Sequence, residues 1–133
     1  MENNLKLSFN GTKYYVNFKK GTVTCTSNCH LKCGDENYLY FINNILMYTL
    51  KEDRVWRGFS VKATARLNEG EVFDEKVGMQ VARAKMESAA YKRMNNILTR
   101  VQNEMNKVGT IVSNFNQKAV GVLEHNDGYL ETF

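Results

Sequence analysis

The sequence predicts an α+β fold, in which an antiparallel sheet of about four strands is followed by a long helical C-terminal half. Residues 59–67 alternate apolar and polar side chains, which is the period-2 pattern of a half-buried strand. After the turn-like residues 68–71, apolar residues recur at spacings of four and three from Val77 onward. That is the period of an amphipathic helix, and Asp74 is well placed to cap its N-terminus.

The N-terminal part of the chain predicts the other three strands. Apolar and polar residues alternate over 5–9, Asn10-Gly11 is a strong signal for a two-residue hairpin turn, and the alternation resumes over 14–18. Lys19-Lys20-Gly21 predicts a second turn. A third strand is then expected over 23–33, with its odd-numbered residues on one face.

Two helices are expected between and after the strands. The apolar residues of 36–51 fit one helical stripe, which favours a short helix, with a strand as the alternative. Residues 74–125 predict a long helix, and Gly109 leaves open whether it breaks into two. The length favours a single domain over 1–133, with 1–70 mostly sheet.

The long helix carries apolar residues on more than one side, which predicts a partner besides the sheet. Its C-terminal part repeats apolar residues at steps of four and three, as the seam of a coiled coil does. The seam residues are Val101, Met105, Val108, Val112, Phe115, Ala119 and Val122. An internal helix hairpin is the alternative, but we expect an obligate homo-oligomer, a dimer or a larger assembly up to a hexamer.

Composition narrows the class of protein. The net charge of +4 favours anionic partners, although no block of like charges predicts a nucleic-acid-binding tail, so nucleic acid is not the expected partner. Three cysteines, an odd number, argue against a disulfide framework. No apolar run has the length of a membrane span and the N-terminus does not have the pattern of a secretory signal, so the expected location is the cytoplasm.

The sequence favours binding over catalysis. Cys25, Cys29, His30 and Cys33 have the wrong spacing for a zinc site, and we expect buried structural cysteines instead. The sequence contains no recognisable nucleophile, phosphate-loop or metalloprotease motif. We therefore expect no enzyme activity, no metal and no cofactor.

Arg83 is the first candidate for a ligand contact. It lies one helical turn before Glu87, among apolar positions of the helix. One interpretation is an ion pair over hydrophobic surface. The other is a guanidinium that lines a pocket and offers its fork to a phosphate.

A second group of candidates surrounds the single tryptophan. Arg54 and Arg57 flank Trp56, an arrangement suited to stacking a base while holding a phosphate, although a tryptophan near a strand start is also often part of the core. Tyr91 and Asn95 on the long helix are added on chemical grounds. Arg93, Arg100 and Lys107 lie at steps of seven on the polar helix face, where a solvated surface is the simpler interpretation.

The run from Lys62 to Gly78, with an acidic turn and the motif F-D-x(3)-G, is followed by Ala82-Arg83-Ala84-Lys85. This strand–turn–helix pattern resembles the first Thoeris anti-defence family of phages over about a third of the chain. The resemblance implies a sponge that sequesters cyclic ADP-ribose isomers, or cyclic oligonucleotides, without degrading them, and that oligomerises through its helices. It implies a ligand role for Arg83. The alternative function is a phage inhibitor that binds a host protein or RNA through its basic helix face.

Overall fold

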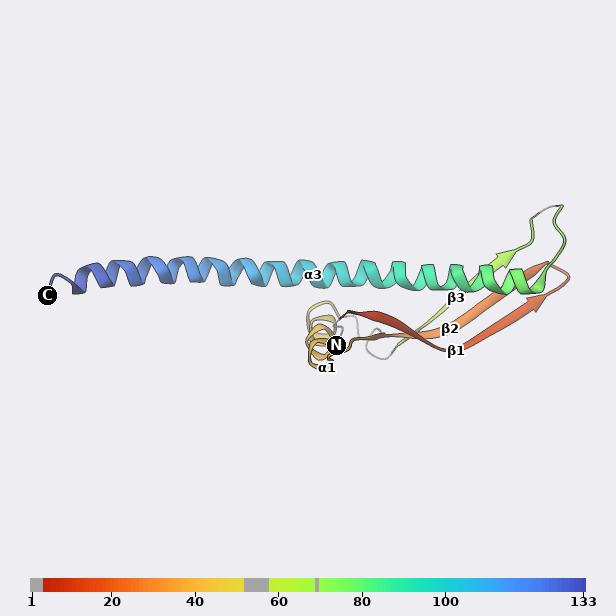
Figure 1. The fold of residues 1–133 in the computed structure, drawn as a ribbon, viewed down its shortest axis with the longest axis horizontal. Helices are drawn as coiled ribbons and strands as arrows, with labels where there is room; N and C mark the ends of the chain where they lie inside the picture. The colour runs from red at the N-terminus through yellow and green to blue at the C-terminus, as the bar shows by residue number, and fades with distance from the viewer. Residues whose placement is uncertain (1–3, 52–57, 69) are drawn as a thin grey trace. The chain divides into compact units, whose positions relative to one another are not determined.

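Three antiparallel strands, β1 (Lys6–Asn17), β2 (Thr22–Lys32) and β3 (Phe59–Arg66), form one sheet in the order β1-β2-β3 (Figure 1). The computed structural model describes residues 4–51, 58–68 and 70–133. The chain divides into two compact units, Met1–Leu98 and Thr99–Phe133. The predicted α+β class is confirmed, with three strands where the sequence predicted about four.

The missing strand is explained by a β-bulge in β1. Asn10-Gly11 does not turn the chain: β1 continues past it, and its register on β2 shifts between Asn10 and Lys13, so two β1 residues face Ser27 alone. Gly11 has a φ of 62°, the left-handed conformation that glycine supplies both to hairpin turns and to this kind of bulge. The Ser27 hydroxyl, which is buried, bonds to the Asn10 carbonyl and to the Thr12 hydroxyl. The predicted hairpin at Asn10-Gly11 is therefore wrong.

The second predicted turn and the third predicted strand are confirmed. The chain turns after β1, where the Lys20 amide donates to Asn17 Oδ1 over 3.1 Å and Gly21 has a φ of 60°. In β2 the odd-numbered residues face the core, as predicted: Val23, Cys25, Ser27, Cys29 and Leu31 are all buried.

The short helix is also present. α1 (Glu36–Asn44) begins after Asp35, whose carboxylate accepts from the Asn37 amide over 2.9 Å, and it continues as a π-helix, η1 (Ile45–Thr49). Asp35 thus satisfies one of the amides that have no partner within the first turn. The predicted range of 36–51 is confirmed to within two residues.

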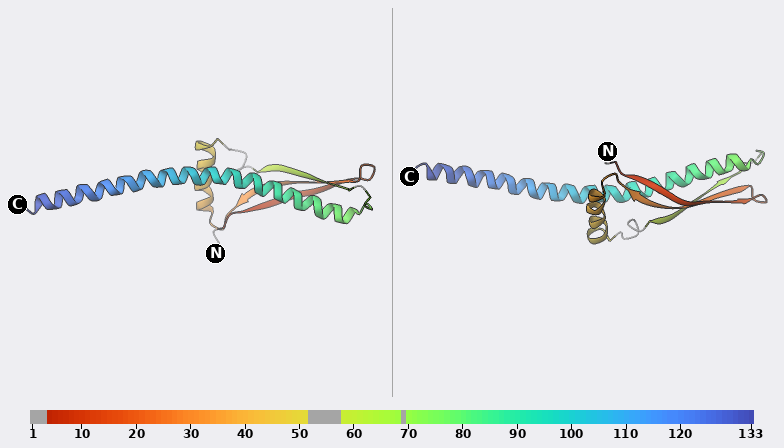
Figure 2. Two further views of the ribbon diagram at one scale, coloured as in Figure 1. Left: turned by 90° about the horizontal axis from the view of Figure 1, so that it is seen from above. Right: turned by 60° about the horizontal axis from the view of Figure 1, so that its bottom comes forward.

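The long helix α3 (Glu75–Leu130) runs for 56 residues and is not broken at Gly109. Asp74 is its N-cap, as predicted: its Oδ1 accepts from the amides of Lys76, at 3.0 Å, and Val77, at 3.2 Å. In the N-terminal unit the first part of α3 lies along one face of the sheet (Figure 2).

The core of this unit lies between that helix face and the sheet. Its buried centre consists of Val23, Cys25, Ala65, Ala82 and Met86. Phe73, just before the helix, packs on this centre and meets the Phe18 ring edge-on, with the ring centroids 5.5 Å apart. Small helix residues let α3 approach closely, because a Cβ built on Gly78 would stand 2.6 Å from Cγ2 of Val23. The close packing of α3 on the sheet therefore requires a glycine at position 78.

The cysteines provide a simple check of this core. Cys25 and Cys29 have no exposed surface, and burial raises the pKa of both thiols, so little reactive thiolate forms at neutral pH. Cys33 is only half-buried. We expect a thiol-specific dye to label Cys33 rapidly in the native protein and all three cysteines after denaturation. Rapid labelling of a Cys33→Ser variant under native conditions would contradict this packing.

Within the described ranges, no helix is long and apolar enough to cross a membrane.

Candidate anion-binding face of the sheet

The sheet face opposite the core is polar and follows directly from strand register. Residues that alternate with the buried ones point to this face, and hydrogen-bonded pairing aligns them in rows across the three strands. Three neighbouring rows are Lys13–Thr26–Lys62, Tyr15–Thr24–Thr64 and Asn17–Thr22–Arg66. The extra residue of the bulge at Gly11 shifts the alternation of β1 by one position. After it the odd-numbered Lys13, Tyr15 and Asn17 lie on the outer face.

The charge of this face is uniformly positive. The three strands contain no Asp or Glu, whereas they contain five lysines and arginines: Lys6, Lys13, Lys32, Lys62 and Arg66. The turn between β1 and β2 adds Lys19 and Lys20. Clustered cations without neighbouring carboxylates give a positive potential that attracts phosphates.

A hollow on this face brings cations, hydroxyls and an aromatic ring together. It has a volume of about 730 Å³ and is lined by Tyr15, Lys20, Thr24, Thr64 and Arg66, among others. The Thr24 and Thr64 hydroxyls bond to each other over 2.8 Å and fix the floor. Tyr15 is 59% exposed and offers its ring for stacking. The arrangement can hold a phosphate, hydrogen-bond a sugar and stack a base.

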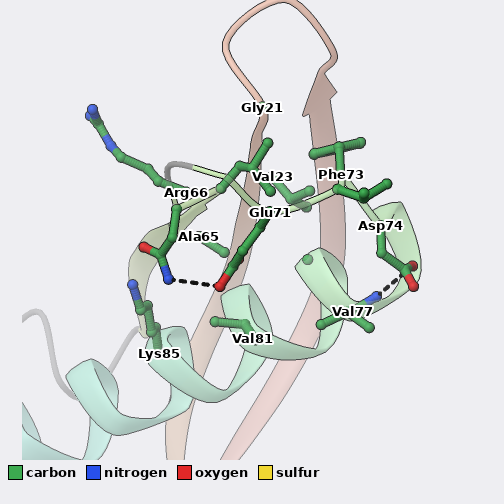
Figure 3. A pocket seen from close by; sticks show the side chains of 14 residues that line it. Gly21, Val23, Ala65, Arg66, Glu71, Phe73, Asp74, Val77, Val81 and Lys85 are labelled. Atoms are coloured by element: carbon green, nitrogen blue, oxygen red, sulfur yellow. Dashed lines mark hydrogen bonds between the residues drawn. The ribbon is translucent and has the colours of Figure 1, made fainter.

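A second hollow, at the junction of β3 and α3, is chemically different (Figure 3). It has a volume of about 390 Å³, and its charged side chains include Lys85, Glu71 and Asp74. The Arg66 guanidinium points away from it in Figure 3. Two carboxylates against one ammonium repel a phosphate, so this hollow is the weaker candidate for a nucleotide.

Arg83 has a protein partner. Its Nε donates to Oε1 of Glu87 over 3.0 Å, and hydrogen bonding by Tyr14, reinforced by the Glu87 charge, raises the pKa of the guanidinium. The ion-pair interpretation of Arg83 is confirmed. A ligand role for it stays a prediction.

The other predicted site residues that the structure describes are Tyr91 and Asn95, and they line a hollow that does not include Arg83. Tyr91 contacts the Phe9 ring, with centroids 6.4 Å apart, and together with Asn95 it lines a small, mainly apolar hollow of about 140 Å³. The cluster of Arg54, Trp56 and Arg57 lies outside the described residues. On the helix, Arg93 stacks over the Phe59 ring at 4.3 Å, which gives it a structural role.

The described residues contain no group of three or more His, Cys, Asp or Glu side chains that could hold a metal ion. The prediction of buried cysteines is confirmed for Cys25 and Cys29. His30 lies on the outer face of β2, opposite to these thiols, and its Nδ1 is 3.4 Å from Nδ2 of Asn10. The C-x(3)-C-H-x(2)-C run therefore places Cys25 and Cys29 on one face of β2 and His30 on the other, and Cys33 follows the end of the strand.

Sequence reasoning missed the cationic sheet face, although a signal for it was present. The polar residues that alternate with the core positions of the strands are lysine, arginine, threonine, serine, asparagine, tyrosine and histidine, and never a carboxylate. The prediction used only the buried positions of each strand, and the absence of Asp and Glu from the other positions was not used.

No protein-family model, no curated protein and no solved structure matches this chain.

The ion pair of Arg83 leads to a prediction of small effect. Arg83 and Glu87 are 41% and 42% exposed, so Arg83→Ala should lower the free energy of unfolding by less than about 1 kcal/mol, as for other solvent-accessible pairs. Glu87→Gln should have a similar effect, and the double variant should cost no more than either single change. Urea unfolding measures all three. A loss of several kcal/mol for Arg83→Ala would show that the guanidinium supports more than this pair.

Proposed function

We propose that the protein is a non-catalytic binder that sequesters a small, phosphate-bearing cyclic nucleotide on the outer face of its sheet. The observation that carries the proposal is the acid-free cationic face with an exposed tyrosine, Tyr15, on its β1 strand. The resemblance to the anti-defence sponges supplies the ligand class, cyclic ADP-ribose isomers or cyclic oligonucleotides. The setting would be a phage counter-defence in the host cytoplasm, with the protein acting as a homo-oligomer.

The roles of the residues follow from their chemistry. Lys20 and Arg66 meet the phosphates, Arg66 with a bidentate fork and Lys20 as a point charge. Tyr15 stacks on the base, and the threonine hydroxyls face the ribose. None of these groups is a nucleophile beside a general base, so the ligand is held and not converted.

A second candidate is single-stranded RNA. It is favoured by one observation: the cations continue along the strands from Lys20 and Arg66 to Lys6 and Lys32, which is longer than a single nucleotide needs. This candidate differs from the nucleotide sponge in its salt dependence, because a polyanion releases several counterions on binding.

Calorimetric titration with a cyclic ADP-ribose isomer tests the proposal. Arg66→Ala and Tyr15→Ala should each weaken binding about tenfold or more, since each removes an interaction of roughly 1.4 kcal/mol or above. Lys92→Ala is the control, because Lys92 is an exposed cation of α3 away from the sheet face. Equal effects of Lys92→Ala and Arg66→Ala would remove the sheet face as the site.

The fate of the ligand separates the classes of function. Heating the loaded protein should release the nucleotide unchanged, whereas an altered product would identify an enzyme. If the protein binds no cyclic nucleotide but binds a single-stranded oligonucleotide with steep salt dependence, RNA replaces the nucleotide as ligand.

A further inference from the structure

The C-terminal unit presents a continuous apolar stripe to solvent. From Met105 to Phe133 every side chain except the half-buried Ala119 is exposed. Yet Met105, Val108, Val112, Phe115 and Val122 are all large hydrophobic residues, between 45% and 68% exposed. With Ala119 they follow the 3–4 spacing that places residues on one face of a helix. This set, 105–108–112–115–119–122, is the seam without Val101, which the sequence pattern included and which is only 3% exposed.

The residues on the far side of the helix from the seam are mostly polar. They include Asn106, Lys107, Ser113, Asn114, Gln117 and Glu124. In water, most of the stability of a helix in a protein comes from packing its apolar face against another element. The exposed Ile111 and Leu123 flank the seam, and Val120 lies outside it. An apolar stripe with a mostly polar opposite face is suited to a second helix of the same kind.

The next seam position after Val122 is Asn126, and the one after that is Tyr129. In heptad terms Met105, Val112, Ala119 and Asn126 are a positions, while Val108, Phe115, Val122 and Tyr129 are d positions. A single asparagine at an a position sets register and orientation in coiled coils, because its amide needs a partner across the interface.

We propose that two copies of this chain associate through residues 105–129 as a parallel, in-register coiled coil, with the two Asn126 side chains paired across it. In this arrangement every seam residue meets its own copy, and the amides bond to each other. The small Ala119 layer lies beside the bulky Phe115 layer and leaves room for its rings. The inference does not depend on the nucleotide.

An antiparallel pairing fits the same residues less well. Matching the seam 105–122 against itself in reverse places Asn126 opposite Val101 of the other copy. Val101 is only 3% exposed and is not available to a partner. Matching 105–129 against itself in reverse places Asn126 opposite Val108 instead. In either register the asparagine amide loses its hydrogen-bonding mate. The polar residue thus distinguishes the two orientations.

A matched pair of substitutions tests the seam. Val112 and Val120 are in the same helix and are 51% and 54% exposed, but only Val112 is in the seam. Light scattering should give the wild type twice the 15.3 kDa of one chain, Val112→Asp one chain, and Val120→Asp the wild-type value. A monomeric wild type at tens of micromolar, a trimer or larger assembly, or equal effects of the two variants would overturn the proposal.

Disulfide cross-linking tests the orientation. In a Cys33→Ser background, Val108→Cys and Ala119→Cys should each form homodimeric disulfides, since each d or a layer pairs with itself. Cross-links that form only when the two variants are mixed would establish the antiparallel arrangement and overturn the proposal. Near-ultraviolet circular dichroism of each variant monitors the N-terminal unit, whose fold these changes should leave intact.

Discussion

Gly78→Ala is expected to lower the free energy of unfolding by about 1–3 kcal/mol, the usual cost of an extra methyl group in a filled core. The added Cβ would stand 2.6 Å from Cγ2 of Val23. Val23 is 1% exposed and belongs to the centre of the core, so its branched side chain has no free space to enter. Chemical denaturation of the two proteins measures the difference.

Gly109→Ala is the matched control in the same helix. A Cβ at Gly109 meets nothing within 4 Å, and alanine has the higher helix propensity, so this change should stabilise by about 0.5–1 kcal/mol. The double change Gly78→Ala with Val23→Ala should be less costly than the sum of the two single changes, because the contact is shared. Equal behaviour of the two alanine variants would mean that α3 does not approach the sheet at Gly78.

Met86→Ala should cost more, about 2–5 kcal/mol, because it removes a large side chain from the middle of the core and leaves a cavity. Met86 has no exposed surface and packs between the helix and the sheet residues Val23, Cys25 and Ala65. Given that small domains are stable by only about 5–15 kcal/mol, this single change should lower the melting temperature substantially.

Met79→Ala is the comparison for Met86→Ala. Met79 lies two turns earlier on the same helix and is only partly buried against the same cluster. The Met79→Ala variant should lose less stability than Met86→Ala, since the Met79 side chain already contacts water and its removal leaves a more open space. A larger effect at Met79 than at Met86 would contradict the position of the core.

The fold was largely predictable because burial imposes its period on the sequence. The alternation in 23–33 and 59–67 reports which residues face the core, and the Asp74 cap marks where the helix begins. The hairpin at Asn10-Gly11 was wrong because a glycine with positive φ serves a turn and a bulge equally well. The switch of apolar residues from odd numbers before Gly11 to even numbers after it does not separate the two, because a two-residue hairpin and a one-residue bulge both produce it.

The site was less predictable, because binding residues follow no period. Arg83 was chosen for its unusual surroundings, and Glu87 satisfies it. The F-D-x(3)-G motif is explained by folding: Phe73 packs on the core, Asp74 caps α3, and Gly78 permits close approach to Val23. The motif therefore reports how the chain folds and does not by itself indicate a ligand. The cationic face depends on cross-strand register, which a sequence does not display.

The acid-free strands also affect how the sheet meets other sheets. In the described sheet β1 and β3 are edge strands, whose outward backbone groups could pair with another chain. Two features discourage such pairing. The charges of Lys6, Lys13 and Lys62 repel the same charges on another copy, and the bulge at Gly11 distorts the edge of β1. Since repulsion between exposed charges is screened by salt, protection of these edges against aggregation should weaken as ionic strength rises. The same lysines that would attract a phosphate would then also keep the protein in solution.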